Sequence, residues 1–174
     1  MKKGFTLIEL LVVVAIVGTL STVVLASLSS TREKANLSRA RAESHAFFIA
    51  LELYLNDHGG DYPADASRNI PPGIEPYLSG SGSWPLGPWP NSVYDWDNWD
   101  DPDHPGKKIY QISIRFCPSG GPLSACTFPP EPWAQNFDVD SAVYYCVSGY
   151  CRAHQSHPVT YPGYCLNCGV QPSG

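Results

Sequence analysis

The sequence predicts an α+β protein in which one long N-terminal α-helix carries a small antiparallel sheet and disulfide-rich loops on its C-terminal half. All 17 prolines lie at Pro63 or later, so the residues before it can form an uninterrupted helix. All six cysteines lie at Cys117 or later, and all five tryptophans lie between Trp84 and Trp133. This distribution is typical of a helix followed by a compact, loop-rich domain.

Composition narrows the function classes. The 174-residue chain has 43% hydrophobic and 16% charged residues, which excludes a disordered polyelectrolyte. Its formal net charge is -5, so broad electrostatic binding to nucleic acid is not indicated. The sequence contains no nucleophile elbow, phosphate-binding loop or His-Glu-x-x-His motif, and we therefore do not expect an enzyme.

The first element is an apolar run over residues 5–28 that follows a short basic start. From Leu10 to Leu28, 14 of 19 residues are apolar and none is charged. A helix over the run would be about 36 Å long, enough to cross a hydrocarbon core of about 30 Å. Lys2 and Lys3 predict a cytoplasmic N-terminus, so the chain would be a single-pass inner-membrane protein with an exported head.

Glu9 lies inside the apolar run, where a carboxylate costs at least about 2.5 kcal/mol on insertion scales. An ordinary signal peptide and a plain membrane anchor are alternative interpretations of the run, but neither explains this acid. Cleavage between Gly4 and Phe5 would create an α-ammonium at the same end of the membrane segment. The Glu9 carboxylate of one subunit could then pair with the amine of a neighbour.

Residues 2–10, KKGFTLIEL, resemble the class III leader of type IV pilins and type II secretion pseudopilins. The resemblance implies that a prepilin peptidase cuts after Gly4 and N-methylates Phe5, and that Glu9 acts in assembly. It also implies a polymer of this chain with other pilin-like subunits, built by an inner-membrane assembly platform into an extracellular or periplasmic filament.

A type IV pilus or a related filament is the expected product of this assembly. A type II secretion pseudopilus and a competence pilus for DNA uptake are the alternatives within the family. A membrane-tethered, disulfide-rich binding module is the alternative from another class.

The apolar run departs from the family pattern in one place. Many members carry a glycine and a proline where the helix unwinds in the filament; Gly18 matches the glycine, but Ala26 stands at the proline position. Hydroxyl side chains at Thr19, Ser21 and Thr22 could still loosen the helix, because they can bond freed backbone groups.

The helix is expected to continue through water over residues 29–58 and to end at Gly59-Gly60. Its apolar residues recur at spacings of three and four, which is typical of a helix that packs on its own domain. These residues are Leu37, Ala40, Phe47, Leu51, Tyr54 and Leu55. The expected organisation is a leader over 1–4, a polymerisation half over 5–28, an exposed half over 29–58 and a head over 59–174.

Alternating apolar and polar residues predict a strand in the head at 110–116, and residues 142–147 predict a second. Ser148-Gly149 would turn the chain into a third strand at 150–152. These strands would form a small antiparallel sheet with its apolar face on the helix. Residues 61–106 are expected to be mostly loop. Their tryptophans could bind sugars or surfaces, but filling a small core is the favoured interpretation.

The six cysteines permit 15 pairings, and an exported domain of this size gains from cross-links. If Ser148-Gly149 is a two-residue turn, Cys146 and Cys151 lie opposite each other at a spacing that allows a disulfide. Cys117 and Cys126 could close a loop around residues 118–125, and Cys165 and Cys168 would form the third pair or have partners elsewhere.

Two clusters contain residue types that bind metals. His154, His157, Cys165 and Cys168 have zinc-like types and spacing, although disulfides are expected to dominate outside the cell. The second cluster is acidic and could hold Ca²⁺. It comprises Asp95, Asp97, Asp100, Asp101 and Asp103, with Asn98 among them.

The acidic cluster is not an EF-hand, because Trp99 and Asp100 stand where that loop needs an acid and a glycine. The family resemblance adds weight to calcium, since major pseudopilins often hold this ion in a head loop. A solvated acidic loop is the alternative interpretation.

Overall fold

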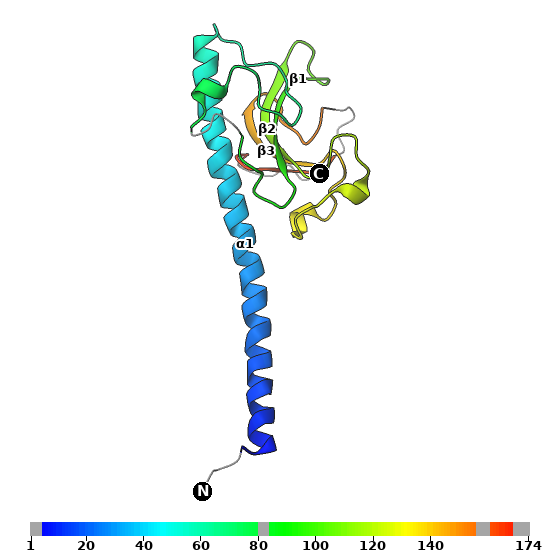
Figure 1. The fold of residues 1–174 in the computed structure, drawn as a ribbon. Coiled ribbons are helices and arrows are strands. Elements are labelled where there is room, and N and C mark those ends of the chain that lie inside the picture. Colours follow the sequence, from blue (N-terminus) through cyan, green and yellow to red (C-terminus); the bar gives the residue numbers. More distant parts are fainter. Residues whose placement is uncertain (1–4, 80–83, 156–160, 169–174) are drawn as a thin grey trace. The chain divides into compact units, whose positions relative to one another are not determined.

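The computed structural model describes residues 5–79, 84–155 and 161–168, except for the side chains of residues 23–27 and 29. The chain forms two compact units, residues 1–37 and 38–174. One α-helix, α1 (Leu7–Asp57), contributes to both units, and Figure 1 shows it as a single coiled ribbon. The expectation of one helix before the first proline is therefore confirmed.

Two glycines end α1. Gly59 and Gly60 have φ angles of 71° and 96°, a left-handed conformation that glycine adopts without a steric penalty. The Gly60 N–H donates to the Leu55 carbonyl at 2.9 Å, which satisfies one of the free carbonyls of the last helical turn. The helix therefore stops where the sequence predicts it.

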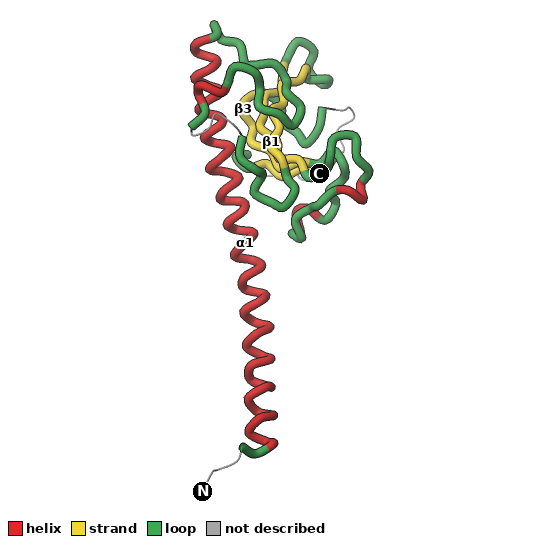
Figure 2. The backbone as a smooth tube through the Cα atoms, in the orientation of Figure 1, coloured by secondary structure: helices red, strands yellow, loops and turns green. Residues whose placement is uncertain are grey.

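The second unit contains a four-stranded sheet in the order β1-β2-β3-β4, which Figure 2 shows as a block of yellow strands among loops. Its strands are β1 (Val93–Asp100), β2 (Lys108–Arg115), β3 (Ala142–Ser148) and β4 (Gly163–Cys165). β1 and β2 pair antiparallel, as do β2 and β3, whereas β4 joins β3 in parallel. In the described parts of the connections, short 3₁₀ helices lie at Glu75–Tyr77, Leu123–Ala125 and Pro132–Ala134.

The third predicted strand, at 150–152, is wrong, and the sheet is mixed rather than wholly antiparallel. The backbone groups of Arg152 bond the side chain of Gln111 instead of a neighbouring strand: its N–H donates to Oε1 at 3.0 Å, and its carbonyl accepts from Nε2 at 2.7 Å. β4 (Gly163–Cys165) takes the place beside β3, along Ala142 to Tyr144.

The loop predicted for 61–106 contains a strand that sequence reasoning missed. Half of the eight residues of β1 are Asp or Asn, which are rare in strands. In the structure Tyr94 and Trp96 alternate with Asp95 and Asp97, and all four are buried. The alternation was present in the sequence, but the acidic residues concealed it.

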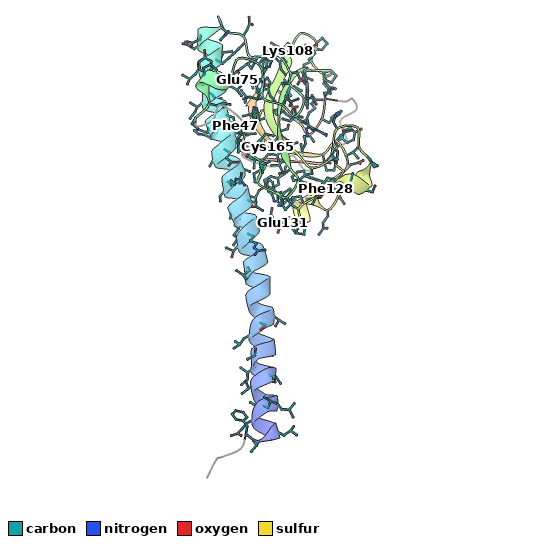
Figure 3. All side chains as sticks on the ribbon, viewed as in Figure 1. Phe47, Glu75, Lys108, Phe128, Glu131 and Cys165 are labelled. Atoms are coloured by element: carbon teal, nitrogen blue, oxygen red, sulfur yellow. A yellow bond between two sulfur atoms is a disulfide. The ribbon has the colours of Figure 1, made fainter. Side chains whose placement is uncertain are left out.

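The core of the second unit lies between the C-terminal part of α1 and the sheet. The stripe on α1 buries Ala40, Phe47 and Leu51, together with Ser44 and Ala50. The ring of Phe47, labelled in Figure 3, contacts Tyr94 of β1 edge-on at a centroid distance of 4.9 Å. Trp89, Trp96 and Trp99 are each at most 8% exposed, so these indoles fill the core.

Three disulfides cross-link the second unit. They join Cys117 with Cys126, Cys146 with Cys151, and Cys165 with Cys168, at Cα–Cα distances of 4.2, 5.5 and 5.5 Å. Between the last two cysteines, Asn167 forms a pair of hydrogen bonds with the backbone of Cys146, each 2.8 Å long. The side chain of Asn167 thereby continues the parallel pairing of β3 and β4 beyond the end of the short strand.

Candidate functional site

The helix start carries the residues that sequence reasoning assigned to assembly. The Thr6 backbone N–H and side-chain hydroxyl both donate to Oε2 of Glu9, at 2.9 and 2.7 Å. The Glu9 N–H donates back to Oγ1 of Thr6 at 3.3 Å. This is a capping box, in which a Thr before the first turn and a Glu three residues later satisfy each other's free donors. The Thr-x-x-Glu spacing at 6–9 could have revealed the role of Thr6, which the sequence analysis did not single out.

The surface around this cap is apolar on all sides. Phe5, Ile8, Val12 and Val13 line a shallow hollow together with Glu9. The large apolar side chains described between Phe5 and Leu20 are all between 49% and 79% exposed. A continuous apolar surface of this extent is typical of a segment that is covered by a partner or by lipid.

The remaining calls on this segment divide between described and undescribed residues. Gly4, the predicted cleavage residue, and the side chain of Ala26 lie outside the part of the chain that the structure describes. α1 runs without a break through Gly18, and the Thr19 and Ser21 hydroxyls donate to the carbonyls of Ile16 and Val17 at 2.9 and 2.7 Å. Among the described residues, no helix combines the length and the apolar character needed to cross a membrane.

Two of the acidic candidates lie inside the head. Arg115 on β2 contacts Asp95 through Nε at 3.1 Å and Asp97 through Nη2 at 3.2 Å, and all three side chains are at most 7% exposed. Nη1 of Arg115 also donates to the Ala153 carbonyl at 2.6 Å. Asp97 additionally accepts a hydrogen bond from the Ser113 hydroxyl. Two carboxylates therefore share one buried guanidinium.

The cluster of Asp95, Asp97 and Arg115 contains two acidic groups and one basic group. Burial raises the pKa of Asp97 to about 6 from an ordinary value of 3.8, the nearby Asp95 adds to the rise, and Arg115 opposes it. The carboxyl of Asp97 is therefore ionised above about pH 6 at a considerable desolvation cost.

We expect Asp97 to make the free energy of unfolding fall as the pH rises from about 4 to about 6. Because its pKa is higher in the folded state, the folded chain holds this proton more tightly, and the change amounts to up to about 3 kcal/mol. Denaturant unfolding of wild type and Asp97→Asn across this range measures it. The wild-type curve should fall relative to that of the variant; parallel curves would contradict the assignment.

The other acidic candidates face different cations. Arg152 contacts Asp101 and Asp103 at 2.8 and 2.6 Å, while Asp100 is exposed and pairs with Lys108 at 3.1 Å. Among the described residues, no group of three or more His, Cys, Asp or Glu side chains is placed to hold a metal ion. The five aspartates thus do not converge on one point.

The zinc-like cluster is also divided. Cys165 and Cys168 are joined in a disulfide, and His157 lies outside the described residues. His154 lies 3.7 Å from Asp140, measured from Nε2 to Oδ1. The described members therefore do not present a set of zinc ligands.

Parts of this chain are similar to known proteins. Residues 1–25 match the model of the prokaryotic N-terminal methylation motif. The type II secretion system core protein G of Aeromonas hydrophila is 34% identical over 100 residues, which cover 52% of this chain and 69% of that protein. The corresponding proteins of Escherichia coli (strain K12) and Pectobacterium carotovorum subsp. carotovorum are 37% identical over 57 residues and 35% identical over 63.

The last two matches cover 33% and 36% of this chain, and only 39% and 40% of those relatives' own length. No solved structure matches the chain. A long N-terminal helix that begins in a methylation motif, with a small disulfide-bonded sheet on its C-terminal part, defines a pilin-like structural subunit. The chain belongs to the family of type IV pilins and type II secretion pseudopilins.

Proposed function

We propose that this chain is a pseudopilin-type filament subunit whose residues 5–28 lie in the inner membrane before assembly and pack against neighbouring subunits afterwards. The observation that carries this proposal is Glu9, the sole charged residue between Phe5 and Thr31, on a helix surface that is otherwise apolar and exposed. An isolated acid in such a surface needs a cation from outside the segment.

Processing supplies that cation. A prepilin peptidase cleaves after Gly4 and methylates the new amine of Phe5. Residues 1–25 match the methylation motif, and Phe5 lies before the first helical residue, Leu7, so the new amine would lie just outside the helix. Unlike removal of a signal peptide, this cut leaves the apolar run attached to the head.

The capping box engages one carboxylate oxygen of Glu9 and leaves the other for an ion pair with a neighbouring subunit. Both hydrogen bonds from Thr6 end on Oε2, and within the described part of the chain no hydrogen bond reaches Oε1. In the proposed assembly the Phe5 ammonium of an adjacent subunit donates a hydrogen bond to Oε1, so each subunit provides one acid and one amine. This contact is heterologous, and its repetition produces an open filament when the rotation between subunits does not close into a ring.

The relatives favour a secretion pseudopilus over a surface pilus, because all three bear the name of a type II secretion core protein. We expect deletion of the gene to abolish type II secretion while DNA uptake and surface pili persist, and the wild-type gene to restore secretion. Normal secretion with lost transformation would assign the chain to a competence pilus instead, and normal secretion with lost surface filaments to a pilus.

A further inference from the structure

The connection between β1 and β2, here called the 101–107 loop, is an acidic segment folded around one buried side chain. The Asp101 N–H donates to the Lys107 carbonyl at 2.9 Å and closes the loop. The side chain of Asp101 has no exposed surface. A carboxylate buried this completely requires a cation or several hydrogen-bond donors.

Arg152 is that cation. Its Nη2 donates to Oδ1 of Asp101 at 2.8 Å and its Nη1 donates to Oδ2 of Asp103 at 2.6 Å. Its Nε donates to the Tyr150 carbonyl at 3.3 Å, so all three nitrogens of the guanidinium have partners. The side chain of Arg152 is only 9% exposed.

The position of Arg152 is fixed by the sheet rather than by the loop. The side-chain amide of Gln111 on β2 bonds both the N–H and the carbonyl of Arg152. Outside the carboxylate contacts, the ring of Tyr150 stacks on His104 of the loop at a centroid distance of 4.0 Å. The guanidinium is thus held at a fixed point beneath the loop.

The oxygens of the loop are already engaged. Oδ1 of Asp101 also accepts the Asp103 N–H at 3.0 Å, and Oδ2 lies 2.9 Å from Nδ1 of His104. The carbonyls of Asp101, His104 and Lys107 accept hydrogen bonds from within the loop. Ca²⁺ takes six to eight oxygen ligands, so binding it here would require the loop to release these bonds and the guanidinium to leave.

We propose that the guanidinium of Arg152 is the resident cation of the 101–107 loop, so that this head folds without calcium. The same geometry implies the converse: loss of the Arg152 charge leaves two adjacent carboxylates, Asp101 and Asp103, that a divalent cation can partly compensate. This inference concerns the folding of the head and is independent of filament assembly.

Thermal unfolding of the full chain in detergent, in chelator and in about 1 mM Ca²⁺, tests the proposal at a concentration that extracellular modules bind. The wild-type midpoint should move by less than about 1 °C between the two conditions. Arg152→Gln should unfold about 5 °C or more below wild type in chelator and regain part of this loss in Ca²⁺. Arg41→Gln is the matched control, since Arg41 donates to the Leu166 carbonyl, and it should not respond to Ca²⁺.

A calcium-dependent rise in the wild-type midpoint would overturn the proposal, as would an Arg152→Gln variant that behaves like Arg41→Gln. If Arg152→Gln does not accumulate as folded protein, the unfolding midpoints of Arg152→Lys and wild type, each in chelator and in Ca²⁺, test the proposal instead. Lysine keeps the charge, so this variant should fold and remain insensitive to Ca²⁺; a response to calcium in it would count against a resident cation.

Discussion

Glu9→Gln should insert into the membrane normally and yet fail to enter filaments. Glutamine serves at the third helical position of a capping box, so the bonds with Thr6 are kept and the helix starts as before. The charge is lost, and the Phe5 ammonium of the neighbouring subunit is left unpaired in an apolar surrounding. An unpaired charge in such a surrounding costs about 2.5 kcal/mol or more, so incorporation of the variant into filaments should fall roughly 50-fold.

Membrane fractions and purified filaments, each probed with an antibody against the head, measure this effect. Glu9→Ala is the companion variant, because it removes the cap as well as the charge and should be at least as defective. Filament yield that is normal in Glu9→Gln and lost in Glu9→Ala would show that the cap matters and the charge does not, which would contradict the proposed pair.

Arg115→Ala is expected to cost the head about 3–5 kcal/mol of unfolding free energy at neutral pH, because Asp95 and Asp97 remain buried without their shared cation. Lys108→Ala is the matched comparison. Its pair with Asp100 is exposed, with 45% and 91% of the two side chains accessible, so its loss should cost less than about 1 kcal/mol. Figure 3 labels Lys108 at the start of β2, the strand that ends at Arg115.

Denaturant unfolding of the disulfide-intact chain in detergent compares the two variants. Equal losses would contradict the assignment of Arg115 as the buried counter-ion. Replacing all three charges at once, in Arg115→Met with Asp95→Asn and Asp97→Asn, should restore part of the stability lost in Arg115→Ala, because no unpaired buried charge remains.

Local signals explain which parts of the fold were predictable. The extent of α1 follows from the absence of proline before Pro63 and from the glycines after Asp57, because both residue types affect only the backbone next to them. β2 follows from the period-two alternation of apolar and polar residues from Tyr110 onward, and β3 from the short apolar run Ala142 to Val147. The same kind of signal places a disulfide across the turn between Cys146 and Cys151, a separation of only five residues.

The rest depends on contacts between residues far apart in the sequence. Asp97 in β1 can be buried only because Arg115, 18 residues later, neutralises it. Arg152 lies 51 residues from Asp101 in the sequence, and its backbone bonds the side chain of Gln111. Because both partners are distant in sequence, no local pattern shows that Arg152 is not part of a strand. At the helix start, Glu9 stands out in the sequence because it is an acid in an apolar run. Its hydrogen bond with Thr6 follows from a different signal, the Thr-x-x-Glu spacing of a capping box.

N-terminal mass analysis of the exported, filament-associated chain tests the central claim most directly. If one subunit's new amine neutralises the acid of the next, the material begins at Phe5 and carries an N-methyl group. A chain that begins at Met1 has no free amine at Phe5, and a chain that begins beyond Leu28 has no apolar segment left, so either result would contradict the assembly proposed here.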